Sequence, residues 1–134
     1  MYNQLSVLKK SLLFSASFLL LLFYSSTLPL SALAAPSAYL SASPDRHYVY
    51  LTFSGLKTVS KVAYTLMYDT AGRTTGLEGG LYTKKATSRT TRRQILGTCS
   101  TQRCTYHKSP KNMNLQVTFY LRSGGTTTLT RSLP

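Results

Sequence analysis

Hydrophobic and polar side chains alternate along most of the chain after residue 36. The pattern is clearest between residues 113 and 121, where every odd position is apolar and the even positions are mostly polar. A period of two is expected for a β-strand with one buried and one solvated face. No stretch of this region keeps a helical period of 3.6, so the sequence predicts an all-β domain.

Turn-forming clusters of Gly, Pro, Ser and Asp separate the alternating runs. The runs predict strands at residues 38–42, 47–53, 61–68, 80–84, 92–98, 104–107, 113–121 and 125–133. This spacing of short strands is typical of an antiparallel β-sandwich. Residues 72–91 contain more Gly, Thr and charge than apolar side chains, and they predict a long, mobile connection.

The expected core comes from three strands. Val49, Leu51 and Phe53 share one face of the second strand, and Tyr64, Leu66 and Tyr68 share one face of the third. The odd positions of residues 113–121 complete this set. Side chains that alternate with the core positions must then face solvent.

The N-terminal segment has the features of a secretory signal. Lys9 and Lys10 precede an uncharged run over residues 11–33, and Ala32-Leu33-Ala34 is a small-x-small cleavage site. We therefore expect residues 1–34 to be a signal peptide and residues 35–134 to be one domain, secreted or at the cell surface. The alternative is an uncleaved membrane anchor, because the run is long enough to cross a bilayer.

The charge balance marks this domain as strongly basic. The chain has 16 Lys and Arg against 3 Asp and Glu, a formal net charge of +13. Without Lys9 and Lys10 the count is 14 − 3 = +11. Chemistry that needs several carboxylates is excluded by so few acids. No acid follows Glu78, and five basic side chains cluster within residues 84–93: Lys84, Lys85, Arg89, Arg92 and Arg93.

Ammonium and guanidinium groups in such a cluster bind phosphate, sulfate or carboxylate groups. We therefore expect an anionic polymer as partner: a cell-wall or envelope polysaccharide, or nucleic acid. A membrane surface with acidic lipids is a further candidate partner, because it is also negatively charged. The alternative is a solvated surface that keeps the protein soluble and its edge strands unpaired.

Tyrosine offers a second kind of contact. If Val49 and Leu51 point inward, Tyr48 and Tyr50 point outward and form a platform on which sugars or bases stack. Cross-strand stabilisation of the sheet is the alternative role. The sequence does not show whether the basic cluster lies on the same face.

Cys99 and Cys104 are the only cysteines, and four residues separate them. In an exported protein this spacing favours a disulfide at the end of a hairpin. A zinc site would have to add His107 and His47, but the spacing is wider than structural zinc sites use. We expect no metal, and the redox motif Cys-x-x-Cys is missing.

The two histidines are the candidate general bases, with Asp45 or Asp69 as orienting acids. No motif places a nucleophile beside them, and their positions at strand ends favour a structural role. We expect no catalysis and no cofactor.

The alternation over residues 39–134 resembles immunoglobulin-like or fibronectin type III-like β-sandwiches, although the Trp and widely spaced cysteines of antibody domains are missing. The segment Leu96-Gly-Thr-Cys99-Ser-Thr-Gln-Arg-Cys104-Thr-Tyr-His107 is similar to one in small secreted bacterial proteins, most of them uncharacterised. The resemblance implies an exported β-sandwich with a hairpin disulfide. It implies no catalytic or binding residues.

Together these features predict an exported, non-catalytic binding or adhesion domain whose basic surface contacts an anionic extracellular polymer. A low-specificity nucleic-acid binder is one alternative. Another is a structural envelope component that assembles through its edge strands. The oligomeric state is left open.

Overall fold

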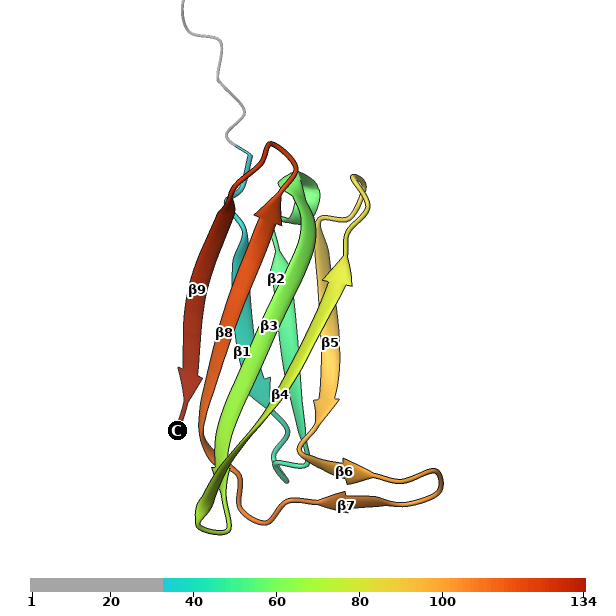
Figure 1. The fold of residues 1–134 in the computed structure, drawn as a ribbon, viewed down its shortest axis with the longest axis vertical. Helices are drawn as coiled ribbons and strands as arrows, with labels where there is room; N and C mark the ends of the chain where they lie inside the picture. The colour runs from blue at the N-terminus through green and yellow to red at the C-terminus, as the bar shows by residue number, and fades with distance from the viewer. Residues whose placement is uncertain (1–32) are drawn as a thin grey trace, which may run out of the picture. The chain divides into compact units, whose positions relative to one another are not determined.

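The structure is a computed structural model that describes residues 33–134, which form strands, one short 3-10 helix, and the turns and loops that connect them (Figure 1). The expected signal peptide lies outside the described residues, apart from its last two positions. Within residues 33–134 no helix is long and apolar enough to cross a bilayer. The elements are β1 (Ser37–Ala42), β2 (Tyr48–Ser54), η2 (Leu56–Thr58), β3 (Val59–Thr70), β4 (Arg73–Tyr82), β5 (Arg89–Ile95), β6 (Gly97–Cys99), β7 (Cys104–Tyr106), β8 (Lys111–Leu121) and β9 (Thr126–Leu133).

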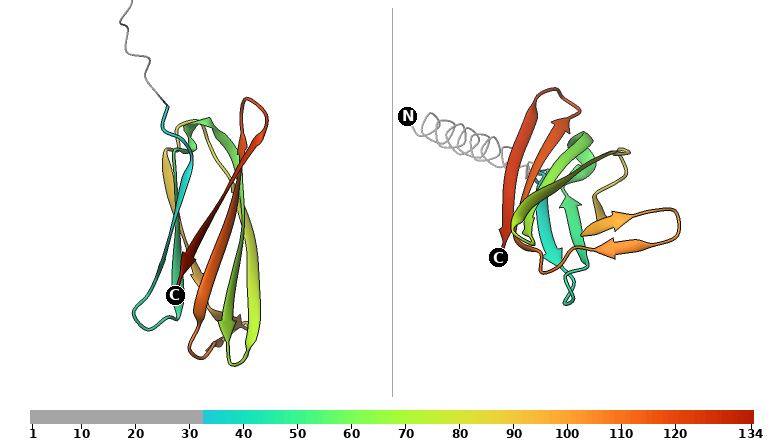
Figure 2. Two further views of the ribbon diagram at one scale, coloured as in Figure 1. Left: turned by 90° about the vertical axis from the view of Figure 1, so that its left-hand side faces the viewer. Right: turned by 60° about the horizontal axis from the view of Figure 1, so that its bottom comes forward.

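Two antiparallel sheets face each other (Figure 2). One has the strand order β1-β2-β5 and the other β4-β3-β8-β9. Phe53 of β2 reaches across to the second sheet, where its ring centroid lies 5.6 Å from that of Tyr64 and 6.3 Å from that of Phe119. A hydrogen bond of 2.5 Å from the Gln94 side chain to the Tyr64 hydroxyl also joins the sheets. The predicted all-β antiparallel fold is confirmed.

The predicted core is also confirmed. Both triplets on β2 and β3 are buried, as are Met113, Leu115, Val117 and Phe119 of β8. Leu40, Leu56, Val59, Val62 and Leu96 complete the main cluster. Burying each large side chain stabilises the fold by about 1.5–3 kcal/mol, so the alternation itself specifies which face of each sheet turns inward.

The predicted long connection over residues 72–91 is wrong. Ten of these residues form β4, paired with β3 from Thr70↔Arg73 to Lys61↔Tyr82, and β5 begins at Arg89. Apolar alternation is weak in β4 because it is an edge strand whose glycines leave room for side chains of β3. A Cβ atom at Gly79 would collide with the Tyr64 ring, and one at Gly76 with the Met67 sulfur.

The strands β6 and β7 form a separate hairpin that projects from the end of the two sheets (Figure 1 and Figure 2). The predicted strand over residues 92–98 is therefore divided, with buried Leu96 between β5 and β6. The predicted disulfide between Cys99 and Cys104 is confirmed, and it closes the outer end of this hairpin. At its base, the Leu96 and His107 amides donate 2.8 Å hydrogen bonds to the carbonyls of His47 and Leu96.

Candidate functional site

The register between β2 and β5 brings predicted tyrosines and arginines to one face. Tyr50 lies opposite Arg93, and Ser54 lies opposite Arg89. Directly opposed residues point to the same side of a sheet, and the intervening positions of β2 are buried in the core. Tyr48, Tyr50, Arg89 and Arg93 therefore share the outer face of the three-stranded sheet.

Arg93 and Tyr48 are in direct contact. The guanidinium carbon lies 4.9 Å from the centroid of the Tyr48 ring, a distance at which the cation is attracted to the ring face. The Tyr48 hydroxyl is 2.8 Å from that of Tyr106 on β7, and the two rings meet edge to face. This hydrogen bond raises the pKa of Tyr106. Tyr48 is thus held in place by an arginine and by the hairpin.

Tyr50 and Tyr39 present more open rings, with exposed fractions of 36% and 65%. Tyr39 lies on β1 opposite Thr52, on the same outer face as Tyr50. Sequence reasoning did not select Tyr39, although its position between buried Ala38 and Leu40 was a sufficient signal. We call Tyr39, Tyr48, Tyr50, Arg89 and Arg93 the tyrosine–arginine face.

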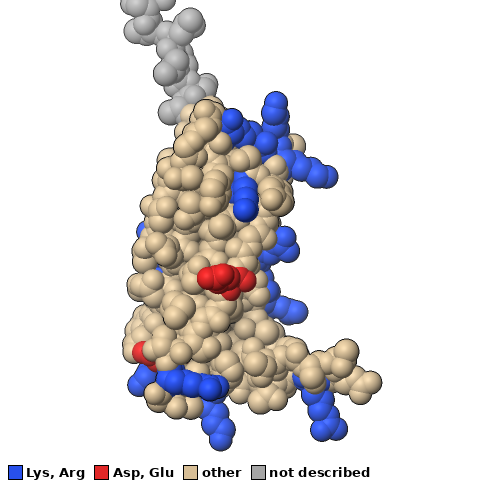
Figure 3. Space-filling model, in the orientation of Figure 1, with Lys and Arg blue, Asp and Glu red and all other residues tan. Residues whose placement is uncertain are grey.

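The other predicted basic residues lie elsewhere. Arg92 is opposite Leu51 and so points to the core side of β5, but it stays exposed because β5 is an edge strand. Lys84 and Lys85 are exposed in the turn between β4 and β5, close in sequence to the Arg89 end of the strand. Figure 3 shows basic side chains along the β4–β5 side and at that end of the molecule. The structure therefore divides the predicted cluster among a face, an edge and a turn.

The histidines have structural partners. The His47 ring stacks on Tyr106 with centroids 3.9 Å apart, and its Nδ1 is 3.0 Å from a carboxylate oxygen of Asp45. The Ser43 hydroxyl donates to the other oxygen of Asp45, and this bond is the main reason why the pKa of Asp45 is lowered. The hydroxyl therefore meets the carboxylate and not the imidazole, unlike a nucleophile beside a general base.

His107 lies at the other side of the hairpin base, with Nδ1 2.9 Å from the Tyr68 hydroxyl. Burial raises the pKa of Tyr68. Within residues 33–134, no three His, Cys, Asp or Glu side chains converge as a metal site would require. Both histidines thus attach the hairpin to the two sheets.

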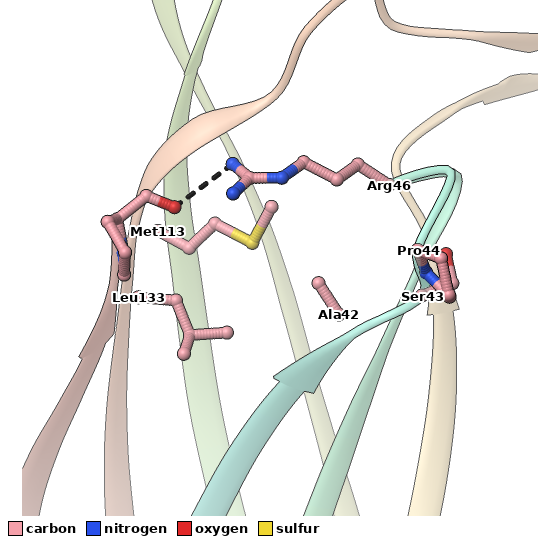
Figure 4. Close-up of a pocket in the computed structure, with 7 residues that line it drawn as sticks. Ala42, Ser43, Pro44, Arg46, Met113 and Leu133 are labelled. Atoms are coloured by element: carbon pink, nitrogen blue, oxygen red, sulfur yellow. Dashed lines mark hydrogen bonds between the residues drawn. The ribbon is translucent and has the colours of Figure 1, made fainter.

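A depression of about 330 Å³ opens beside the β1–β2 turn (Figure 4). Met113 and Leu133 line it, and Arg46 extends across it. The Arg46 guanidinium donates to the carbonyls of Pro110 at 2.8 Å and Pro134 at 3.0 Å. Arg46 thus joins the β1–β2 turn to Pro134, which follows β9, and this gives its guanidinium a structural role in the depression.

Comparisons with known proteins found no matching family model, no matching curated protein and no matching solved structure.

Proposed function

We propose that the chain is an exported, non-catalytic binding domain that contacts an anionic extracellular polysaccharide of the cell wall or envelope through the tyrosine–arginine face. We further propose that its two sheets form a fibronectin type III-like sandwich. The strand orders β1-β2-β5 and β4-β3-β8-β9 support this type, because they divide the seven main strands among residues 33–134 three to four around one core.

The observation that carries the functional proposal is the interleaving of aromatic and cationic side chains. Arg89 and Arg93 are four residues apart on β5, about 13 Å along the strand, so they reach separate anionic groups of one polymer chain. Each guanidinium can donate two parallel N–H hydrogen bonds to the oxygens of a carboxylate or sulfate. The exposed rings of Tyr39 and Tyr50 supply flat apolar surfaces for sugar rings between these charges.

Single-stranded nucleic acid is the second candidate, and the same interleaving favours it. Bases stack on exposed aromatic rings while arginines contact phosphates. One face of Tyr48 is covered by Arg93, which leaves Tyr39 and Tyr50 as the better stacking positions. A strong loss of affinity for oligo(dT), larger than that for a polysaccharide, on Tyr39→Ala and Tyr50→Ala together would favour this candidate.

The test uses residues 35–134, which contain every described strand and the whole core. Binding to polygalacturonate and to oligo(dT) is measured for the parent protein and for Arg89→Gln/Arg93→Gln. The matched control is Arg73→Gln/Lys108→Gln, which removes the same charge from exposed positions outside this face. We expect at least a tenfold loss only in the first variant. Equal losses in both variants would show a general charge effect and contradict the proposed site.

A further inference from the structure

The outer face of the four-stranded sheet has a different character. Its outward positions on β3, β4, β8 and β9 are mostly Thr, Ser, Asn, Gln and Gly. Lys61 and Lys111 balance Glu78 and Asp69, so this face has no net charge in a domain of +11. Figure 3 views it directly: most of the face is uncharged, with an acidic side chain near its centre. We call it the threonine-rich face. An anionic polymer gains little from such a surface.

Two tyrosines stand on this face on either side of Lys61. The register places Tyr82, Lys61 and Tyr120 in one row across β4, β3 and β8. The Lys61 ammonium is 5.7 Å from the Tyr82 centroid and 5.3 Å from the Tyr120 centroid. Tyr82 is 82% exposed and Tyr120 is 39% exposed. A ring as exposed as Tyr82 adds little burial to the fold, so its apolar surface is open to a ligand.

The next row provides a hollow beside these rings. Ala63 and Gly80 lie opposite each other there. A shallow depression of about 180 Å³ begins at Ala63 and Tyr64. Its polar lining consists of Thr65, Glu78, Gln116 and Thr118. Within residues 33–134 Glu78 forms no ion pair, so its carboxylate oxygens are open to hydroxyl donors. Aromatic rings therefore adjoin a set of hydroxyl, amide and carboxylate groups.

We infer that the threonine-rich face binds a neutral, β-1,4-linked glycan, with its sugar rings on Tyr82 and Tyr120 and its hydroxyls on the polar lining of the hollow. A pyranose ring with equatorial hydroxyls exposes C–H groups on its flat faces and hydrogen-bonding groups around its rim. The C–H faces suit a tyrosine ring, and the rim suits Glu78, Gln116 and Thr118. The open, shallow shape of the face suits an extended chain.

Other occupants fit less well. A nucleic acid would meet Glu78 where it needs a cation. A stable protein interface has a continuous apolar centre, whereas on this face the exposed Met67 and the small Ala63 lie among Thr65, Glu78, Gln116 and Asn114. This site is separate from the tyrosine–arginine face, and either proposal stands or fails without the other.

The test is calorimetric titration of residues 35–134 with cellohexaose and chitohexaose, at 0.05 and about 0.5 M NaCl. These are neutral β-1,4-linked probes, and maltohexaose, which is α-linked, is the comparison ligand. We expect one of the β-linked probes to bind with little dependence on salt, and maltohexaose to bind more weakly. Tyr82→Ala should weaken binding about tenfold or more, as for the loss of one stacking ring.

The matched control is Tyr39→Ala, which removes an exposed tyrosine from the opposite face and should leave this binding unchanged. Thermal melts would show that both variants fold, since neither ring is buried. Failure of both β-linked probes to bind would overturn the inference. So would equal losses in Tyr82→Ala and Tyr39→Ala, or binding that falls steeply with salt.

Discussion

The two outer faces of this domain follow the same rule of alternation but differ in charge and chemistry. On the tyrosine–arginine face, Arg93 covers Tyr48 from 4.9 Å, and a second arginine lies on the same strand. On the threonine-rich face, a single lysine lies between two tyrosines, and acids cancel the positive charge. The core dictates only the inward positions, so the outward positions of each sheet are available for separate kinds of contact.

The difference also concerns the chemistry of the cation. A guanidinium lies flat on a ring while its N–H groups still reach an anion, whereas an ammonium is a compact point charge with a strong hydration shell. Arg93 therefore combines stacking with anion binding, and Lys61 mainly orders the tyrosines beside it. We expect this contrast to appear as a salt-sensitive ligand on one face and a salt-insensitive ligand on the other.

The largest expected effect is a loss of folding stability, which would affect both outer faces at once. Phe53 is fully buried and contacts rings of the opposite sheet. Phe53→Ala should lower the free energy of unfolding by about 3–5 kcal/mol, because it leaves a cavity between the sheets. Urea denaturation measures the loss. Tyr39→Ala should change this free energy by less than about 0.5 kcal/mol. Similar values for the two variants would mean that the sheets do not share this core.

The next effect concerns the disulfide, which lies outside both faces. Closing a loop as short as that between Cys99 and Cys104 stabilises a chain by about 2 kcal/mol in the chain-entropy model. Cys99→Ala/Cys104→Ala should therefore reduce the free energy of unfolding by up to about 2 kcal/mol while both sheets remain. Urea titrations with circular dichroism measure this. A loss of all β-structure would show that the hairpin holds the entire fold.

A smaller change should distinguish the faces from each other. Tyr106→Phe removes the hydroxyl that is 2.8 Å from the Tyr48 hydroxyl, at a cost of about 1 kcal/mol in stability. Because Tyr48 belongs to the tyrosine–arginine face, affinity for polygalacturonate should fall a few-fold, and affinity for the neutral glycan should not change. Direct titration of both ligands provides the comparison. Equal losses of affinity for both ligands would show that the hairpin affects the whole domain and not the tyrosine–arginine face alone.

The smallest effect depends on pH. Hydrogen bonds from Thr74 and then Asn112 lower the pKa of Asp69 near the end of β3. Since the folded-state pKa is below the unfolded one, this stabilisation is present above the ordinary pKa of about 4 and disappears as pH falls through the lowered value. Asp69→Asn should therefore be less stable than the parent at pH 6, and the difference should shrink by pH 2. A constant difference at all pH values would contradict the role of the charged form.

The sequence predicted the elements in which one face is buried, because burial imposes a visible period of two. The core strands β2, β3 and β8 were found on this ground, and the disulfide followed from two closely spaced cysteines in a chain that we expect to be exported. Only the end of the edge strand β4 was predicted, at residues 80–84, because Gly79 occupies an inward position opposite Tyr64 where an apolar side chain would have marked the strand. The two apolar side chains that do face inward, Leu77 and Leu81, are too few to make the alternation visible in the sequence.

The binding faces were only partly predictable. Alternation correctly turned Tyr50 outward, but the pairing of Tyr50 with Arg93 depends on which strand lies beside β2. No local pattern specifies that choice. The row of Tyr82, Lys61 and Tyr120 comes from three separate strands, and most of one of them, β4, was expected to be a loop.

The most direct test of the account is the salt dependence of polygalacturonate binding, compared between Arg89→Gln/Arg93→Gln and the control Arg73→Gln/Lys108→Gln. Release of counterions makes log affinity fall linearly with log salt concentration, with a slope that grows with the number of charge contacts. We predict that the slope becomes shallower by about 1 to 2 in the first variant and stays at the parent value in the control. Equal slopes in all three proteins would contradict the claim that the tyrosine–arginine face is the anion-binding surface.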